Sequence, residues 1–584
     1  MSHVFKFLFI LCLIYSCSNK GNFNFKVKTT QPLNKTTTIV TTSSNRSDLY
    51  KSYNNGEFHP IIQTSEINSY LPKVILIGEK IYYSVLLEAA SNSNERLTVS
   101  LENTSFSNFK CYRIIPISDW YSEANKHKVS LEFIPDALFA LKRLTDNRFS
   151  FDIEQGEKVQ LFMEMEGISA GKHNVDIKLS SLKNNGVYNL SFPVEVVKDN
   201  SSDFKTNSII FNNINLQSGK YVVDTWKEVG FTHLQVNYIP TVYFNSNGDP
   251  QSSIISNSSN STGFRNTAYP WLKDGGSILL FWESNYDKVA LLKDGGYLKP
   301  FTAPWYKAYK FILEEQFRLL KELYPHVSKD NIIVYVADEL KSVDIENKKF
   351  TVNQLRDFSV FLEDELSEFK TLVTYGYQSD VASVDLLTGI DIKVPHVNLP
   401  VSNILLNKTI KPTDIYKELN IENKWMYSVE RGRFSSLESF RFNPMIAVAH
   451  GYKGYSWYAF TDHAGSTWYA TDLNRLDYSM YYHSEPNNPI YSYWSSRMGT
   501  NEYLTSSLRL KSIEKGLLNA SILENILSKK DSLSKNQRYR LDEILQILLE
   551  YNVTYTEKPS FSEAYHNKCK EIEISLRLLQ SELN

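Results

Sequence analysis

Two adjacent carboxylates, Asp338 and Glu339, are the residues of this chain whose type and position best suit chemistry. They follow residues 332–336, an unbroken apolar and aromatic run typical of a parallel-sheet strand buried on both faces. Carboxylates at the carboxyl end of such a strand are costly unless solvated or paired, and (β/α)8 barrels build their active sites at this end. Two carboxylates this close cannot both ionise freely, so one pKa should rise, as a general acid requires. The alternative is a solvated loop start or a helix cap.

The region around this pair alternates strands with helices, which is typical of a barrel or a doubly wound sheet. Eight candidate strands occur, the number that closes a (β/α)8 barrel, and the Asp-Glu pair then follows the fourth of them. Pro304 in a first helical turn, with apolar residues after it at near-helical spacing, supports one of the intervening helices. The candidate strands are 208–211, 232–238, 277–283, 332–337, 371–375, 391–397, 424–429 and 454–460.

The rest of the chain indicates further modules around a barrel over residues 205–500. A chain of 584 residues is long enough for two or three domains with full cores. Residues 57–200 carry short alternating runs such as KVQLFMEME, which predict an antiparallel β-sandwich that braces the barrel. Residues 501–584 are amphipathic and predict packing helices. The predicted fold class is therefore α/β with an all-β amino-terminal module.

The amino terminus resembles a bacterial lipoprotein leader. Residues 1–16 combine a cationic start with a short apolar run, which fits a signal peptide. The residues up to Cys17 resemble a lipobox, so Cys17 is the expected lipidation site, and an ordinary signal peptide is the alternative. Residues 17–56 are rich in Asn, Thr, Ser and Lys and predict a flexible tether. We expect a lipid-anchored protein of the bacterial cell envelope, periplasmic or at the cell surface.

Composition excludes several function classes. Hydrophobic residues make up 42% and charged residues 22%, so the chain is globular. The formal net charge of -2 offers no general attraction to nucleic acid, and we predict no nucleic-acid partner. No metal-ligand spacing or phosphate-binding glycine loop occurs, so we predict no metal and no cofactor. Whether Cys111 and Cys569 form a disulfide is left open.

Three segments resemble glycoside hydrolase family 123. Residues 320–340, LKELYPHVSKDNIIVYVADEL, are similar to that family's helix, loop and fourth strand, where its members carry an adjacent Asp-Glu pair. Residues 438–460 are similar to its segment running into an aromatic last strand, and residues 507–523 to a helix beginning Ser-Leu-Arg. The resemblance covers roughly residues 220–527, and GLLNASIL stands where the family has an acidic stretch.

This resemblance implies a glycosidase that removes terminal β-linked N-acetylhexosamine, with N-acetylgalactosamine as the expected sugar, from a glycan or glycoconjugate. In that family the 2-acetamido group of the substrate acts as the nucleophile. The resemblance implies that Glu339 is the general acid and base and that Asp338 orients the acetamido group.

Aromatic residues near strand ends are candidates for substrate binding. Trp282 after strand three, and Trp457 and Tyr458 in the last strand, could form a platform under a sugar ring. Tyr375 and Tyr377 at the end of strand five could donate a hydrogen bond to the acetamido oxygen. Core packing explains each of them as well.

Two rival functions remain at this point. Glu430 closes the seventh strand, where a retaining barrel glycosidase with an enzymic nucleophile usually has its carboxylate, so the chain could cleave a sugar without an acetamido group. The second rival is a surface glycan-binding lipoprotein without activity.

Arg441 could hold a carboxylate in the site or form a surface salt bridge.

Overall fold

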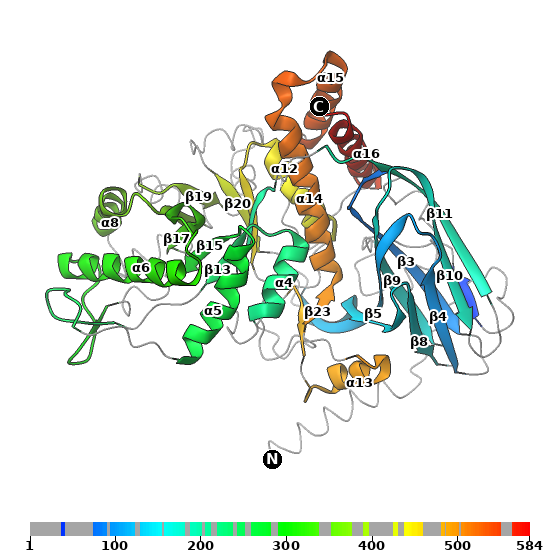
Figure 1. The fold of residues 1–584 in the computed structure, drawn as a ribbon, viewed down its shortest axis with the longest axis horizontal. Coiled ribbons are helices and arrows are strands. Elements are labelled where there is room, and N and C mark those ends of the chain that lie inside the picture. The colour runs from blue at the N-terminus through cyan, green and yellow to red at the C-terminus, as the bar shows by residue number, and fades with distance from the viewer. Residues whose placement is uncertain are drawn as a thin grey trace.

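A computed structural model of the chain shows a parallel barrel and a sandwich of two β-sheets, with a column of helices between them (Figure 1). The residues that the structure describes are 37–40, 74–89, 94–122, 129–154, 157–181, 187–200, 205–211, 219–236, 242–251, 258–281, 290–337, 352–375, 389–395, 424–429, 437–458, 480–484, 486–500, 504–549 and 563–583.

The barrel contains all eight strands that the sequence predicts. They run parallel in one sheet in the order β19-β18-β17-β15-β13-β12-β21-β20. A parallel bridge between Lys393 and Lys424 links the two outer strands, so the sheet is nearly closed. Their bounds are β12 (Asn207–Phe211), β13 (His233–Val236), β15 (Ser277–Phe281), β17 (Ile332–Ala337), β18 (Lys370–Tyr375), β19 (Ile392–Pro395), β20 (Trp425–Val429) and β21 (Gly454–Tyr458).

Strand side chains alternate between the barrel interior and the surrounding helices. On β17, Ile333 and Tyr335 belong to the apolar cluster inside the barrel, whereas Val334 and Val336 pack in the cluster that includes the helices. Burial on both faces explains why this strand reads as an unbroken apolar run.

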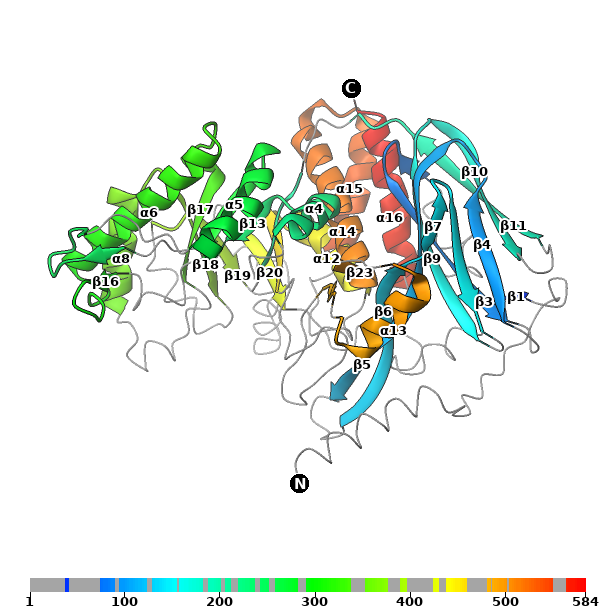
Figure 2. The ribbon, with the colours of Figure 1, turned by 60° about the horizontal axis from the view of Figure 1, so that its bottom comes forward.

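Helices cover the outside of the barrel, and α14 completes their ring. It packs against α12 on one side and α4 on the other, the place of an eighth barrel helix (Figure 2). Within the described part of the chain, no helix is both long and apolar enough to cross a membrane. The helices are α4 (Gly219–Val229), α5 (Ser258–Lys273), α6 (Ala303–Leu323), α8 (Val352–Glu365), α12 (Leu437–Ala449), α13 (Pro489–Met498), α14 (Leu508–Ser528), α15 (Lys535–Leu549) and α16 (Glu563–Ser581), with 3-10 turns η6 (Lys329–Asn331) and η8 (Lys530–Ser532).

The sandwich consists of a seven-stranded sheet, β1-β3-β9-β5-β6-β23-β22, and a six-stranded sheet, β2-β11-β10-β4-β8-β7, around one apolar core. Its strands are β1 (Thr37–Val40), β2 (Val74–Leu76), β3 (Lys80–Ala89), β4 (Glu95–Leu101), β5 (Phe106–Ser122), β6 (Val129–Ala140), β7 (Lys142–Thr145), β8 (Arg148–Ile153), β9 (Lys158–Gly167), β10 (Gly171–Ser181), β11 (Val187–Val197), β22 (Tyr482–His483) and β23 (Leu504–Ser507). Two short strands, β14 (Tyr243–Phe244) and β16 (Leu291–Leu292), pair apart from both sheets.

The sandwich draws on parts of the chain that the sequence assigned elsewhere. β1 pairs with β3 although it lies in the predicted tether, and its β-branched residues favour a strand. β23 pairs with β6, so the predicted division at residue 500 falls inside a region that belongs to the sandwich sheet. Sequence patterns report local periodicity, whereas these two pairings join segments that are distant in the sequence, most of all β6 and β23.

Buried ion pairs tie the sandwich to the helix column. The carboxylate of Glu79, in the turn after β2, accepts hydrogen bonds from Arg577 of α16, at 2.6 Å from Nη2 to Oε1, and from Lys515 of α14. Arg509 of α14 donates to Asp136 of β6 at 2.8 Å. Because these residues are almost fully buried, removal of one partner would leave an uncompensated charge between the two parts.

Arg441 belongs to this network, and neither role expected for it holds. On α12, its Nε donates to Glu573 of α16 at 2.7 Å, and both residues are buried. Arg441 therefore belongs to a buried ion pair between α12 and α16. The sequence gives no local sign of this pair, because its two members lie 132 positions apart.

Candidate active site

The carboxyl ends of the parallel strands meet at one mouth of the barrel, and in the sequence the predicted site residues stand at or shortly after these strand ends. Asp338 and Glu339 directly follow β17, Trp282 follows β15 and Glu430 follows β20. These four, and Tyr377 after β18, lie outside the described residues. Their assignment to this mouth therefore remains a prediction supported by the strands that precede them.

The end of β17 is irregular directly before the carboxylate pair. Tyr335 pairs with Leu372 of β18, but Ala337, two residues later, pairs with Val373, one residue later. Val336 is thus the extra residue of a β-bulge. Bulges bend a strand and re-aim the side chains near them, and they are common next to active sites.

This bulge bears on how both carboxylates could reach one sugar. In a regular strand, consecutive side chains point to opposite faces, so Asp338 and Glu339 would diverge. The register shift at Val336 falls two residues before Asp338, and a bulge there is of the kind that changes the direction of a strand. The sequence predicts that the backbone turns at the pair itself, and because the pair lies outside the described residues this turn remains a prediction.

A buried hydroxyl pair lies inside the barrel, two residues before the end of β17 and one residue before the end of β18. The Tyr335 phenol and the Thr374 hydroxyl are 2.7 Å apart, and each residue is about 1% exposed. Tyr427 of β20 lies in the same interior cluster as Tyr335. Sequence reasoning missed this hydroxyl pair. Strand alternation could have assigned Tyr335 to the barrel interior, because it stands two residues before Ala337 on β17.

The aromatic candidates separate into two groups. Tyr375 and Tyr458 are the last residues of β18 and β21, so their backbones reach the carboxyl end of the barrel. Trp457 is fully buried among helix-facing residues, with its ring centroid 6.0 Å from that of Phe231 and 4.8 Å from that of Tyr455. Trp457 is therefore a packing residue, which is the alternative that the sequence left open for it.

Other reactive groups contribute little in the described part of the chain. No three His, Cys, Asp or Glu side chains there are grouped so that they could hold a metal ion. Cys111, on β5 of the sandwich, is a buried free thiol, so it forms no disulfide with Cys569. Burial raises the pKa of this thiol well above its usual range, which keeps it protonated and unreactive.

Comparison with solved structures agrees with this architecture. The chain is similar to a family 123 glycoside hydrolase from Clostridium perfringens, with a TM-score of 0.58 and 12% identity, covering 87% of this chain and 91% of that one. A family 39 glycoside hydrolase from Bacteroides cellulosilyticus WH2 has a TM-score of 0.34 at 10% identity, over 79% of this chain and 82% of that one. No protein-family model and no curated protein matches the sequence. The chain, with its sandwich and nearly closed parallel barrel, is thus similar in fold to the Clostridium perfringens family 123 enzyme.

Proposed function

We propose that this protein is a glycoside hydrolase that removes terminal β-linked N-acetylhexosamine, with N-acetylgalactosamine as the expected sugar. One observation carries the proposal: Asp338 and Glu339 directly follow the bulged fourth strand of a parallel barrel whose fold is that of a family 123 glycoside hydrolase. The proposed substrate is a glycan or glycoconjugate, since the likeness in structure is to an enzyme described for glycolipid glycan hydrolysis.

In the proposed mechanism, the substrate supplies its own nucleophile. Glu339 donates a proton to the glycosidic oxygen while the acetamido oxygen attacks the anomeric carbon, and the leaving alcohol departs. Asp338 accepts a hydrogen bond from the acetamido N–H and stabilises the positive charge of the oxazolinium ring that forms. Glu339, now ionised, takes a proton from the water that opens this ring, so configuration is retained.

The adjacency of the two carboxylates supports this division of roles. Like charges this close disfavour double ionisation, so one carboxyl keeps its proton to a higher pH. The group that stays protonated suits a general acid, and the ionised one suits stabilisation of a cation.

The aromatic residues at strand ends complete the proposal. Trp282 is a candidate platform under the sugar ring, and Tyr458 is another. Tyr375 and Tyr377 are candidates to donate a hydrogen bond to the acetamido oxygen. Trp457 is left out because it is buried in the core.

A second candidate function rests on the position of Glu430 directly after β20, the seventh strand of the barrel. Strands four and seven carry the two carboxylates in this alternative, with Glu430 as an enzymic nucleophile on a sugar without an acetamido group. It requires Glu339 and Glu430 to lie roughly 5–5.5 Å apart. A third candidate is a glycan-binding protein without activity.

The experiment compares a 4-nitrophenyl β-N-acetylgalactosaminide with the plain β-galactoside, for the wild type and the Glu339→Gln, Glu430→Gln and Glu365→Gln variants. We expect cleavage of the acetamido substrate alone, lowered roughly 10²–10⁴-fold by Glu339→Gln. The exposed Glu365 of α8 pairs with Lys310 at 2.7 Å and serves as the matched carboxylate control.

Each other outcome selects a different account. Cleavage of the plain galactoside, abolished by Glu430→Gln, would favour the enzymic nucleophile. Absence of cleavage together with tight binding on a glycan array would favour the binding protein. A β-linked disaccharide should be tested beside the nitrophenyl glycoside, because a poorer leaving group depends more on the acid.

We also propose that Cys17, which lies outside the described residues, carries a lipid that anchors the protein in the bacterial cell envelope. Detergent phase partitioning tests this. Wild-type protein from bacterial cells should enter the detergent phase, and Cys17→Ala should remain in the aqueous phase. Aqueous partitioning of both would leave an ordinary signal peptide as the better account.

A further inference from the structure

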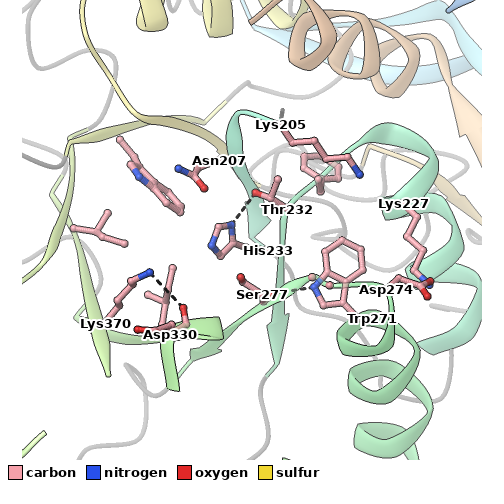
Figure 3. A pocket seen from close by; sticks show the side chains of 16 residues that line it. Lys205, Asn207, Lys227, Thr232, His233, Trp271, Asp274, Ser277, Asp330 and Lys370 are labelled. Carbon is pink, nitrogen blue, oxygen red and sulfur yellow. Dashed lines mark hydrogen bonds and ion pairs between the residues drawn. The ribbon is translucent and has the colours of Figure 1, made fainter. Parts of the chain in front are cut away.

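A cavity of about 270 Å³ opens at the amino end of the barrel, opposite the candidate active site (Figure 3). His233 and Trp425, the first residues of β13 and β20, line it together with Lys370, the first residue of β18. Lys205 and Trp271 line it as well. Its volume exceeds the ~10–15 Å³ needed by one water by an order of magnitude, so a small molecule fits.

The charges around this cavity are predominantly positive. Three lysines line it against two aspartates. Lys227 forms an ion pair with Asp274 and also donates to the Pro270 carbonyl of α5 at 3.1 Å, so its charge is compensated. Lys370 donates to the backbone carbonyl of Asp330, at 3.4 Å.

The charges of the other two lysines, Lys205 and Lys370, are available to attract an anionic ligand. Among the residues that the structure describes, neither Lys205 nor Lys370 has a carboxylate within ion-pair distance. Both are exposed at the rim. Figure 3 shows them on opposite sides of His233.

His233 forms the polar base of the cavity. The residue is 7% exposed, and its Nδ1 lies 2.8 Å from the Thr232 hydroxyl, which in turn donates to the Ser208 carbonyl at 3.1 Å. The other ring nitrogen points away from Thr232, toward the side where Lys370 lies (Figure 3). If Nδ1 donates to Thr232, this chain of bonds suits an imidazolium whose second N–H is available to an anion.

We propose that this cavity binds a small molecule bearing one oxyanion group, a phosphate or a carboxylate, between Lys205 and Lys370 with His233 donating from below. The two tryptophans that line the cavity and its excess volume accommodate the carbon skeleton that carries the anion. The site is independent of the proposed hydrolysis, because it lies at the other end of the barrel.

Ligand binding at this place is coupled to protonation of His233. Burial and the nearby Lys370 lower the pKa of His233 to about 3, so the ring is neutral in the free protein. An anion would offset the field of Lys370 and accept from the second ring N–H, which raises that pKa. Binding should therefore take up a proton and strengthen as pH falls.

Isothermal titration calorimetry of the full chain tests the proposal, with inorganic phosphate, glucose 6-phosphate, glucuronate and neutral glucose as probes. We expect one of the anionic probes to bind at roughly pH 6 and glucose not to bind. Whether glucose 6-phosphate or glucuronate binds more tightly distinguishes phosphate from carboxylate recognition. Binding of glucose as tightly as its phosphate, or of no probe, would overturn the proposal.

Variants tie the binding to this cavity. Lys370→Met and Lys205→Met should each weaken the affinity about tenfold, since each removes a charge-assisted hydrogen bond. Lys535→Met, at an exposed position on α15, should leave it unchanged. Equal affinity in all three variants would locate the anion elsewhere and contradict the proposal.

The number of protons taken up on binding tests the role of His233, because a residue that only supports the structure would not change it. Titrations in two buffers of different ionisation enthalpy give the number of protons taken up per ligand. Wild type should take up a fraction of a proton, and His233→Gln should take up none while it keeps the circular-dichroism spectrum of the wild type. Uptake that persists in the variant would exclude His233 as the coupled group.

Discussion

The two ends of the barrel are built differently. At the amino end, short turns lead into the strands, and only residues 230–232 separate α4 from β13. At the carboxyl end, residues 338–351 separate β17 from α8. The short turns are fixed by side chains that bond the backbone, such as the Thr232 hydroxyl, which accepts from Ser208 N at 2.7 Å.

This difference shows where chemistry and stability can be divided in one sheet. Long connections tolerate varied residues, so binding and catalytic groups concentrate in them, whereas tightly bonded turns hold the strands in register. Substitutions in the connections that follow the carboxyl ends of the strands should therefore change activity and spare stability. Those at the amino end should do the reverse.

The largest expected effect comes from Asp338→Asn, just past the carboxyl end of β17. Loss of the charge that stabilises the oxazolinium should lower kcat/KM on the acetamido substrate roughly 10²–10³-fold. Unfolding in urea should be unchanged.

Asp330→Asn is the matched control, because Asp330 is exposed and precedes the same strand at its amino end. It should retain activity. Equal losses of activity from the two variants would break the distinction between the ends.

A smaller effect is expected in the pH dependence of stability, through His233 at the amino end. Its pKa is lowered from 6.5 to about 3 by burial and by Lys370, so the unfolded chain binds a proton that the folded chain does not. Stability therefore falls as pH decreases from the unfolded value toward the folded one, by about 2 kcal/mol at roughly pH 5. Urea unfolding of wild type and His233→Gln across this range measures it. A constant difference between them would contradict the assignment.

Tyr335→Phe tests the buried hydroxyl pair of Tyr335 and Thr374, inside the barrel near its carboxyl end. It removes the 2.7 Å hydrogen bond with the buried Thr374 hydroxyl, which should lower the free energy of unfolding by about 1 kcal/mol. Activity per folded molecule should change little. A loss of activity like that of Asp338→Asn would show that the phenol takes part in the site.

The smallest effect is expected at Asp391, whose Oδ2 accepts from the Thr371 N–H at 2.8 Å. Asp391 is exposed, so water can replace its carboxylate, and Asp391→Ala should cost about 0.5–1 kcal/mol. Thermal unfolding measures this, with kcat/KM as the control. A drop in kcat/KM without loss of stability would reverse the expected roles of the two ends.

The sequence predicted the barrel well because each strand carries its own signal. All eight strands were found, since parallel strands buried on both faces read as apolar runs between helical patterns. It failed where structure depends on distant pairing. No local pattern in residues 504–507 indicates that β23 joins the sandwich sheet. The helical pattern of α14 likewise does not indicate that it packs between α12 and α4.

The candidate site was only partly within reach of sequence reasoning. Position after the fourth strand follows from counting strands, but the bulge at Val336 depends on the register with β18. The aromatic residues show a second limit. Trp457 faces the helices and Tyr335 faces the barrel interior, and the residue type alone does not distinguish these two positions. The cavity at the amino end combines the first residues of β13, β18 and β20, which lie far apart in the sequence and form no local motif.

The central claim, that the substrate's acetamido group is the nucleophile, is tested most directly with a series of 4-nitrophenyl glycosides whose acetamido methyl carries none, one, two or three fluorines. Fluorine makes the acetamido oxygen a poorer nucleophile and barely changes the leaving group. The account predicts that kcat/KM falls with each added fluorine. A value of kcat/KM that stays constant across the series would contradict it and favour Glu430.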